Sequence, residues 1–158
     1  MKDRGECAQK IAIRRAGVDD LETLADLAVL MWENSTKESL TAEFAETMRD
    51  PAACFFLLSV GEKSIGFSQA QLRTDYVEGT HTSPVGYLEG IFVMPEYRRR
   101  GYAGKLVRMC EAWTREAGCM EFASDCPVEN RVSYAFHLHM GFIEANRIIC
   151  FTKQVPKL

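Results

Sequence analysis

The densest group of ligand-binding residue types lies in one short segment: Arg98, Arg99, Arg100, Gly101, Tyr102, Ala103, Gly104 and Lys105. Small residues let the backbone approach a ligand closely, and the N–H groups at a helix start are free to bind an anion. The apolar residues before this segment, up to Val93, predict a strand. A strand, a turn and a basic helix start together favour a phosphate-binding loop. The alternative is an ordinary charged helix start.

The two best-known phosphate-binding sequences are absent from this chain. Lys105 is followed by Leu106, so there is no G-x-x-x-x-G-K-[ST] sequence, and there is no G-x-G-x-x-G sequence. A metal site is not expected either. His137 and His139 are two residues apart on a predicted helix, so their side chains face apart.

Two carboxylates lie on predicted buried strands. Glu89 alternates with Tyr87, Ile91 and Val93 on one face of the most apolar strand, and Asp125 ends the next strand. An ionised carboxylate in such a place is costly unless it is paired or takes part in chemistry. If the two strands are neighbours, both carboxylates reach the same gap. The alternatives are a structural ion pair for Glu89 and a helix cap for Asp125.

Length and composition limit the class of protein. The 158 residues fit a single domain over residues 1–158, with the 47% hydrophobic and 26% charged residues of a globular protein. No apolar run approaches the roughly 18 residues that span a bilayer, and the N-terminal residues lack a signal-peptide core. We therefore expect a cytoplasmic location and no membrane partner. The six cysteines occur singly, without a C-x-x-C pair, and predict reduced thiols.

The distribution of charge suggests the kind of ligand. The net charge of −3 argues against binding to nucleic acid. Five basic and no acidic residues lie between Arg98 and Arg108, whereas three acidic residues and no Lys or Arg lie between Asp75 and Glu89. This asymmetry fits an enzyme that joins a polyphosphate cofactor to a cationic substrate.

Hydrophobic periodicity predicts the elements that position these residues. The expected strands cover residues 10–15, 53–60, 64–74, 86–93, 120–126 and 143–153, and the expected helices begin near Asp19, Ser35, Tyr102 and Asn130. Ser35 and Glu38 are expected to form a capping box for the second helix. This order predicts an α/β fold, with a central mixed sheet and helices on both faces.

The sequence R-x-x-G-x-A from Arg98 to Ala103, after a strand that ends near a Pro, resembles the acetyl-CoA pyrophosphate loop of the GCN5-related N-acetyltransferases. Asn130 and Gly141-Phe142 also match positions of that family. The resemblance implies that family's mixed-sheet fold, with acetyl-CoA as co-substrate. It implies cofactor contacts from Ile91, Phe92, Val93, Arg98, Arg99, Arg100, Gly101, Tyr102, Ala103, Gly104, Lys105 and Asn130.

His137 stands where that family has a catalytic Tyr. The departure keeps the spacing but leaves the identity of the general acid open. An imidazolium could protonate the leaving thiolate, and a neutral imidazole could hydrogen-bond the sulfur. The alternative is a half-buried helix histidine.

A closer resemblance covers residues 11–153. The segments DYVEG, YLEGIFV and EFASD resemble the bacterial aminoglycoside 6'-N-acetyltransferases. That resemblance implies acetyl transfer to the 6'-amine of an aminoglycoside, hence antibiotic resistance, and a homodimer. It implies that the aminosugar contacts Trp32, Tyr76, Glu78, Glu89 and Asp125. The LWP-type sequence of the family is MWEN here, without the Pro, and Trp32 also fits a plain core position.

Residue chemistry suggests direct transfer in a ternary complex. An acidic cleft attracts a polycation, and Glu89 or Asp125 accepts the proton of the attacking amine, whose free pKa is roughly 10. Backbone N–H groups near Ile91 and Phe92 polarise the thioester carbonyl, and His137 is the candidate proton donor to the thiolate. Two other functions stay open, namely acetylation of a polyamine or protein amine and a CoA-binding sensor without activity.

Overall fold

The computed structural model describes residues 10–157, which form two compact units divided after Asp125. Cys7, one of the predicted thiols, lies outside the described residues, and the single domain over residues 1–158 stays a prediction. No helix within residues 10–157 is long and apolar enough to cross a membrane.

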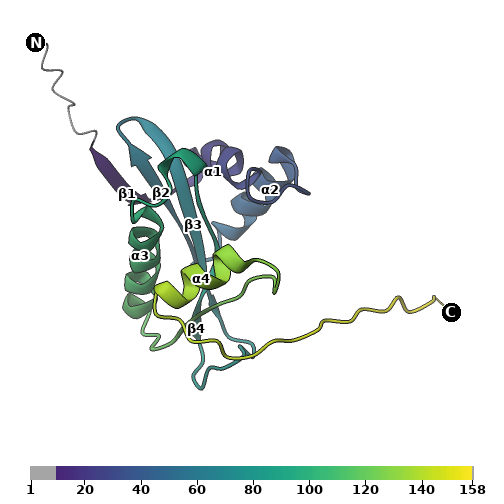
Figure 1. The fold of residues 1–158 in the computed structure, drawn as a ribbon. Coiled ribbons are helices and arrows are strands. Elements are labelled where there is room, and N and C mark those ends of the chain that lie inside the picture. The colour runs from purple at the N-terminus through teal and green to yellow at the C-terminus, as the bar shows by residue number, and fades with distance from the viewer. Residues whose placement is uncertain (1–9, 158) are drawn as a thin grey trace, which may run out of the picture. The chain divides into compact units, whose positions relative to one another are not determined.

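A mixed sheet of five strands forms the centre of the first unit (Figure 1). The strands follow chain order across the sheet: β1 (Ile11–Arg15), β2 (Ala53–Val60), β3 (Lys63–Arg73), β4 (Val85–Val93) and β5 (Phe122–Ser124). The first four pair antiparallel, and β5 pairs parallel with β4. The mixed sheet predicted from the sequence is therefore confirmed, although β5 is shorter than expected.

Helices cover both faces of this sheet (Figure 1). On one face, α1 (Leu21–Ala28) and α2 (Lys37–Thr47) bury an apolar core against β2, β3 and β4, in which Phe44 and Phe67 are fully buried. On the other face lies α3 (Tyr102–Glu116), whose Cys110 donates a hydrogen bond to Ser68 of β3. Short 3-10 turns precede α1 (Val18–Asp20) and follow β4 (Pro95–Tyr97).

The start of α2 differs from the prediction. Thr36, not Ser35, is the N-cap: its hydroxyl accepts the Ser39 N–H at 3.1 Å, and its own N–H donates to the Ser39 hydroxyl at 3.1 Å. Ser39 thus completes the capping box in place of Glu38. The prediction was wrong by one residue because Ser and Thr hydroxyls are equally able to accept this bond.

A β-bulge interrupts β4 at Glu89. Gln69 of β3 pairs with Gly90 and Ala70 pairs with Leu88, so Glu89 has no Cα partner on β3. A bulge inserts one residue and changes which face the following side chains take.

The bulge overturns part of the predicted face of β4. Tyr87 and Glu89 do share a face, because both contact Arg73. Ile91 instead pairs with Ser68, whose side chain is directed at α3 on the opposite face, and Val93 follows Ile91. The expectation that all four residues share one face is therefore wrong for Ile91 and Val93.

The second unit contains α4 (Arg131–His139) and an extended segment. Asn130 caps α4, since its side chain accepts the Ser133 N–H at 3.0 Å, as the expected helix start required. The strand predicted over residues 143–153 is wrong, because within the described residues this segment has no strand structure and pairs with no other strand. An extended apolar segment becomes a strand only when a neighbour satisfies its backbone groups.

Gly66 of β3 gives a test of the packing that holds β4 in place. A Cβ at this position would lie 2.5 Å from the backbone oxygen of Phe92, which cannot move without shifting β4. We expect Gly66→Ala to lower the free energy of unfolding by about 1–3 kcal/mol in urea titration. The matched control is Gly17→Ala, where nothing lies within 4 Å of the added Cβ and stability should hold. Equal stability of both variants would contradict this packing.

Candidate active site

The candidate site begins where β4 and β5 cease to pair. The last paired residues are Leu88 and Ser124, and the Ser124 hydroxyl donates to the Leu88 oxygen at 3.1 Å. Beyond this point β4 continues to Val93 without a strand on that side in the described part of the chain. The predicted condition for the two carboxylates is met, because Glu89 and Asp125 each directly follow the last pair on neighbouring strands.

Arg73 forms an ion pair with Glu89. The Arg73 Nε donates to Glu89 Oε1 at 2.9 Å, and Nη2 donates to Oε2 at 2.7 Å. The Glu89 side chain is only 17% exposed, so burial of its charge is offset by this two-point contact. The hydrogen bonds to Glu89 raise the pKa of Arg73, which stays charged.

Tyr87 connects this ion pair to Asp125. Its ring lies under the Arg73 guanidinium, with 3.4 Å between Cζ and the ring centroid, and its hydroxyl donates to Asp125 Oδ1 at 2.6 Å. Burial and the bond to Asp125 both raise the pKa of the Tyr87 phenol, so it remains a proton donor at neutral pH. Glu89, Arg73, Tyr87 and Asp125 thus form one connected cluster, which we call the carboxylate cluster.

The Trp32 ring lies beside β4 at Gly90, the residue after Glu89. A Cβ built on Gly90 would come within 3.0 Å of the Trp32 ring, so the ring occupies the space that a side chain at Gly90 would take. Trp32 also packs against Phe44 and Phe67, at centroid distances of 6.2 and 6.1 Å. It is half-buried, and therefore both supports the core and presents an edge to solvent.

The loop between β3 and β4 carries Tyr76 and Glu78. Both side chains are exposed, and the Tyr76 hydroxyl donates to Glu78 Oε2 at 3.2 Å. Glu121, next to β5, fastens this loop: its carboxylate accepts the backbone N–H groups of His81 and Thr82 and the Thr82 hydroxyl. These bonds lower the pKa of Glu121, the Thr82 hydroxyl most of all.

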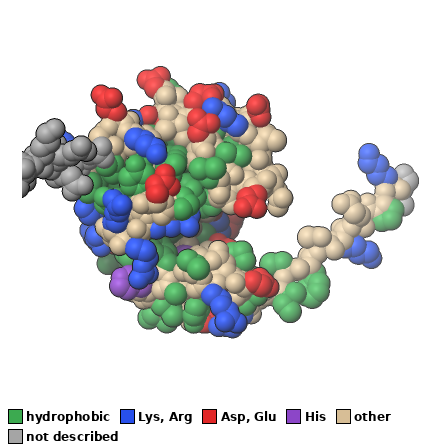
Figure 2. Space-filling view, turned by 45° about the horizontal axis from the view of Figure 1, so that its top comes forward, with side chains coloured by type: hydrophobic (Ala, Val, Ile, Leu, Met, Phe, Trp, Pro, Cys, Tyr) green, Lys and Arg blue, Asp and Glu red, His purple; other side chains and the backbone are tan. Residues whose placement is uncertain are grey.

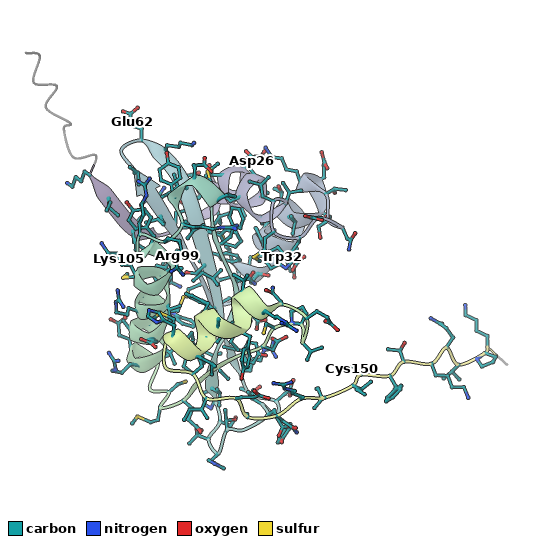
Figure 3. All side chains as sticks on the ribbon, in the orientation of Figure 1. Asp26, Trp32, Glu62, Arg99, Lys105 and Cys150 are labelled. Carbon is teal, nitrogen blue, oxygen red and sulfur yellow. The ribbon has the colours of Figure 1, made fainter. Side chains whose placement is uncertain are left out.

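Two residues of the predicted phosphate loop have a positive φ. Gly101 has φ +76° as the N-cap of α3, and no atom lies within 4 Å of a Cβ built on it. Arg99 also has a positive φ of 62°, which is costly for a non-glycine residue and is often found at ligand sites. Figure 3 shows Arg99 and Lys105 at the start of α3, on the other side of the sheet from Trp32.

The other arginines of this loop have backbone partners. Arg98 turns back to β4, where its Nε donates to the Val93 oxygen at 2.8 Å, and Arg100 makes a weaker contact of 3.4 Å with the Glu96 oxygen. Arg98 therefore ties the loop to the strand, whereas Arg100 is exposed and loosely held.

Two predicted site residues belong to the second unit. The side-chain oxygen of Asn130 accepts the Ser133 N–H that caps α4. The Nδ1 of His137 lies 2.7 Å from the Ser133 backbone oxygen, which only accepts, so Nδ1 carries a proton. The ring also packs against Phe136 and Phe142, at centroid distances of 5.7 and 5.1 Å.

The cysteines and a small pocket on the first unit contribute little to this site. Burial raises the pKa of Cys54 to about 12 and that of Cys110 to about 11, so neither thiol is a ready nucleophile.

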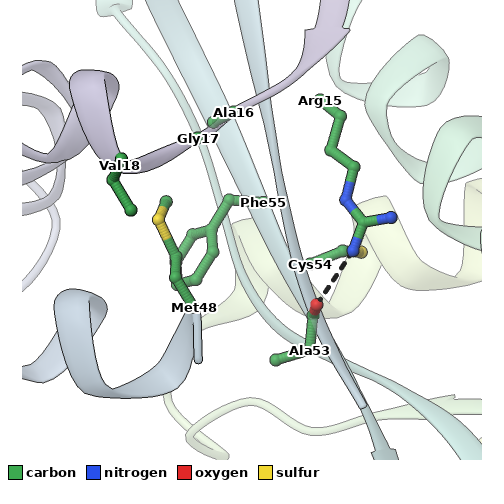
Figure 4. Close-up of a pocket in the computed structure, with 8 residues that line it drawn as sticks. All are labelled: Arg15, Ala16, Gly17, Val18, Met48, Ala53, Cys54 and Phe55. Carbon is green, nitrogen blue, oxygen red and sulfur yellow. Dashed lines mark hydrogen bonds between the residues drawn. The ribbon is translucent and has the colours of Figure 1, made fainter. Parts of the chain in front are cut away.

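The small pocket lies where β1 and β2 meet the end of α2, and the Arg15 side chain reaches across it to the Ala53 oxygen (Figure 4). Its lining contains no carboxylate and none of the predicted site residues.

Three residues of the site were not predicted from the sequence. Arg73 and Tyr87 belong to the carboxylate cluster, and Glu121 holds the neighbouring loop. Arg73 and Tyr87 share a face only through the register of β3 and β4. A signal existed in the alternation of β3, which puts Gln69, Gln71 and Arg73 on one face. It required knowing that β3 pairs with β4.

Comparison with known proteins gives consistent matches. Residues 21–142 match the model of the Acetyltransferase (GNAT) family. An aminoglycoside N(6')-acetyltransferase type 1 of Acinetobacter haemolyticus is 36% identical over 143 residues, which cover 90% of this chain and 98% of that protein. The enzyme of the same name from Acinetobacter genomosp. 13 is 48% identical over 94 residues, covering 60% of this chain and 64% of its own length, just under two thirds.

Solved structures give the same result. The aminoglycoside N-acetyltransferase AAC(6')-Iy in complex with CoA has a TM-score of 0.90 at 34% identity, covering 98% of this chain and 100% of that one. The same protein in complex with the bisubstrate analog CoA-S-monomethyl-acetylneamine has a TM-score of 0.88 at 34% identity, covering 92% and 99%.

Glu121 offers a test of the loop that carries Tyr76 and Glu78. Because its pKa is lowered in the folded state, its bonds persist above the ordinary carboxyl pKa of 4.5 and are lost as the pH falls through the lowered value. We expect amide protection factors of His81 and Thr82 to fall over that acid range. Glu121→Gln should reduce them at neutral pH and remove the acid step, and exposed Glu62→Gln should change neither. Unaltered protection in Glu121→Gln would contradict the fastening.

Proposed function

The chain belongs to the Acetyltransferase (GNAT) family, and we propose that it transfers the acetyl group of acetyl-CoA to the 6'-amine of aminoglycoside antibiotics. The observation that carries this proposal is the pair of carboxylates, Glu89 and Asp125, which follow the point where β4 stops pairing with β5. The relatives with this activity in their names, and the neighbour bound to an acetylneamine analog, support the same substrate. Acetylation of the amine removes a positive charge, and we propose antibiotic resistance as its consequence.

The loop after β4 fits acetyl-CoA. The open space at Gly101 and the positive φ of Arg99 suit a pyrophosphate, as do the N–H groups that the start of a helix leaves without an intrahelical partner. We assign the phosphates to Arg99, Arg100, the Lys105 side chain and the backbone from Gly101 to Gly104, with Arg98 holding the loop on β4. The Lys105 N–H donates to the Gly101 oxygen at 3.2 Å. The backbone of Ile91 to Val93 would contact the pantetheine arm, and Asn130 is proposed as a further contact. Acetyl-CoA supplies the activated acetyl group.

The proposed mechanism is direct transfer. Trp32, Tyr76 and Glu78 hold the aminosugar beside the carboxylate cluster, where negative charge attracts the polycation. A carboxylate of the cluster accepts the proton of the ammonium, so that the neutral amine attacks the thioester. Backbone N–H groups of β4 near Ile91 and Phe92 stabilise the oxyanion. His137 is proposed as the proton donor to the sulfur.

We also propose a homodimer in the cytoplasm. Large apolar side chains of the extended C-terminal segment are exposed, including Ile143 at 90% and Phe151 at 88%. Figure 2 shows hydrophobic side chains along this segment. Apolar surface of this kind commonly marks a contact with another chain. The cytoplasmic location is supported by the five described cysteines, all of which are free thiols.

Regiochemistry tests the proposed activity directly. An aminoglycoside with a 6'-amine should be acetylated, and its 6'-hydroxy counterpart should be spared, because a hydroxyl is a far weaker nucleophile. The thiol released from acetyl-CoA measures turnover, and NMR of the product locates the acetyl group. An acetyl group on the 2'- or 3-amine would leave an acetyltransferase but overturn the 6' assignment.

Arg100 tests the cofactor loop. Arg100→Ala should raise the KM for acetyl-CoA without changing the KM for the aminoglycoside, since a charge-assisted hydrogen bond contributes about 1.5–3 kcal/mol. Exposed Arg115→Ala near the end of α3 is the matched control. Calorimetry on the same variants measures acetyl-CoA binding, and an unchanged affinity of Arg100→Ala would remove this arginine from the cofactor site.

A further inference from the structure

The two carboxylates of the cluster have different partners. Glu89 uses both oxygens on Arg73, at 2.9 and 2.7 Å, and is 17% exposed. Asp125 is exposed and, in the part of the chain that the structure describes, accepts one hydrogen bond, from the Tyr87 hydroxyl. The charge of Glu89 is therefore compensated by direct contact with Arg73. Asp125 forms no ion pair within residues 10–157, and Arg73 acts on it only over a longer distance.

Arg73 is held firmly in this arrangement. Its guanidinium stacks on the Tyr87 ring at 3.4 Å while it donates to both oxygens of Glu89. A planar guanidinium that stacks and binds a carboxylate at two points has little freedom to leave. Tyr87 in turn orients Asp125 through its hydroxyl, which donates to Oδ1. The second carboxylate oxygen, Oδ2, accepts no hydrogen bond from the residues that the structure describes.

We propose that Arg73 and Tyr87 are positioning residues that give the two carboxylates different roles. Arg73 keeps Glu89 as its counter-ion, and Asp125, oriented by Tyr87, is the carboxylate that binds the substrate ammonium and accepts its proton. This assignment rests on the proposed function, acetyl transfer to a primary amine. It selects one base where residue types alone left two.

The proton balance of the step is complete. The ammonium gives one proton to the Asp125 carboxylate, and the freed nitrogen lone pair attacks the thioester carbon. The C–N bond forms, the C–S bond breaks, and CoA leaves as a thiolate that takes a proton from His137. The second proton that the nitrogen loses replaces the one that His137 gave. Asp125 then releases its proton to solvent, so Glu89 needs no change of charge at any stage.

A double-mutant cycle separates Asp125 from Glu89. Glu89→Gln removes the counter-ion of Arg73. The uncompensated positive charge of Arg73 then makes Asp125 a weaker proton acceptor, so kcat should fall. Adding Arg73→Gln removes that misplaced charge and should restore most of the lost kcat. Asp125→Asn removes the base itself, and its kcat should fall by roughly 10²–10⁴-fold, with no recovery when Arg73→Gln is added.

One further variant tests the positioning role of Tyr87, and a distant ion pair serves as the control. Tyr87→Phe keeps the ring under Arg73 and removes the hydroxyl, so kcat should fall less than in Asp125→Asn, while the KM for acetyl-CoA holds. The control is the exposed Arg49–Glu46 pair of the α2 end, at 3.3 Å, where Glu46→Gln and Arg49→Gln should leave kcat unchanged. Thermal unfolding of each variant checks that it folds.

The outcomes distinguish this inference from the proposed function. Loss of kcat in Glu89→Gln that persists in the double variant, together with near-normal kcat in Asp125→Asn, would make Glu89 the base and overturn the inference alone. The cycle is measured with the primary amine that the wild-type protein acetylates. Activity on a polyamine instead of an aminoglycoside would overturn the proposed substrate and leave the cycle intact, and a wild-type protein inactive on every amine would overturn both.

Discussion

The end of the parallel pairing between β4 and β5 is the constraint on which the candidate site depends. Up to Leu88 and Ser124 the two strands are held together, and beyond them β4 has no strand on that side among the described residues. The bulge in β4 falls at the next residue, Glu89, which shares the face of Tyr87, and it turns Ile91 and Val93 to the opposite face. Two features of one strand thus coincide, and Glu89 and Asp125 each directly follow the last pair between β4 and β5.

The charges at this point suit a cationic substrate because they are only partly compensated. Arg73 neutralises Glu89 through two hydrogen bonds, and the hydroxyl of Tyr87 orients Asp125 without adding a charge. Burial would otherwise make a pair of like charges costly. Glu121 holds the nearby loop of Tyr76 and Glu78 by its backbone, so further acidic and aromatic groups come from a fastened segment.

The sequence predicted much of this arrangement because local signals specify it. Periodicity predicts α3, and glycine marks its start at Gly101. That the strands of Glu89 and Asp125 are neighbours was a condition in the sequence analysis, and the structure meets it. Arg73 could not be assigned, because its contact with Glu89 depends on the pairing and register of β3 and β4, which no local pattern specifies. The strand expected over residues 143–153 failed for a related reason, since an apolar segment forms a strand only where another strand pairs with it. The roles of the individual site residues stay predictions.

A crystal structure with CoA and an aminoglycoside that has a 6'-amine would test the central claim most directly. The carboxylate cluster predicts that the 6'-nitrogen lies within hydrogen-bond distance of Asp125, that Arg73 still donates to both oxygens of Glu89, and that the CoA sulfur lies beside the unpaired part of β4. A complex in which Arg73 has left Glu89 and the 6'-nitrogen binds Glu89 instead would contradict it.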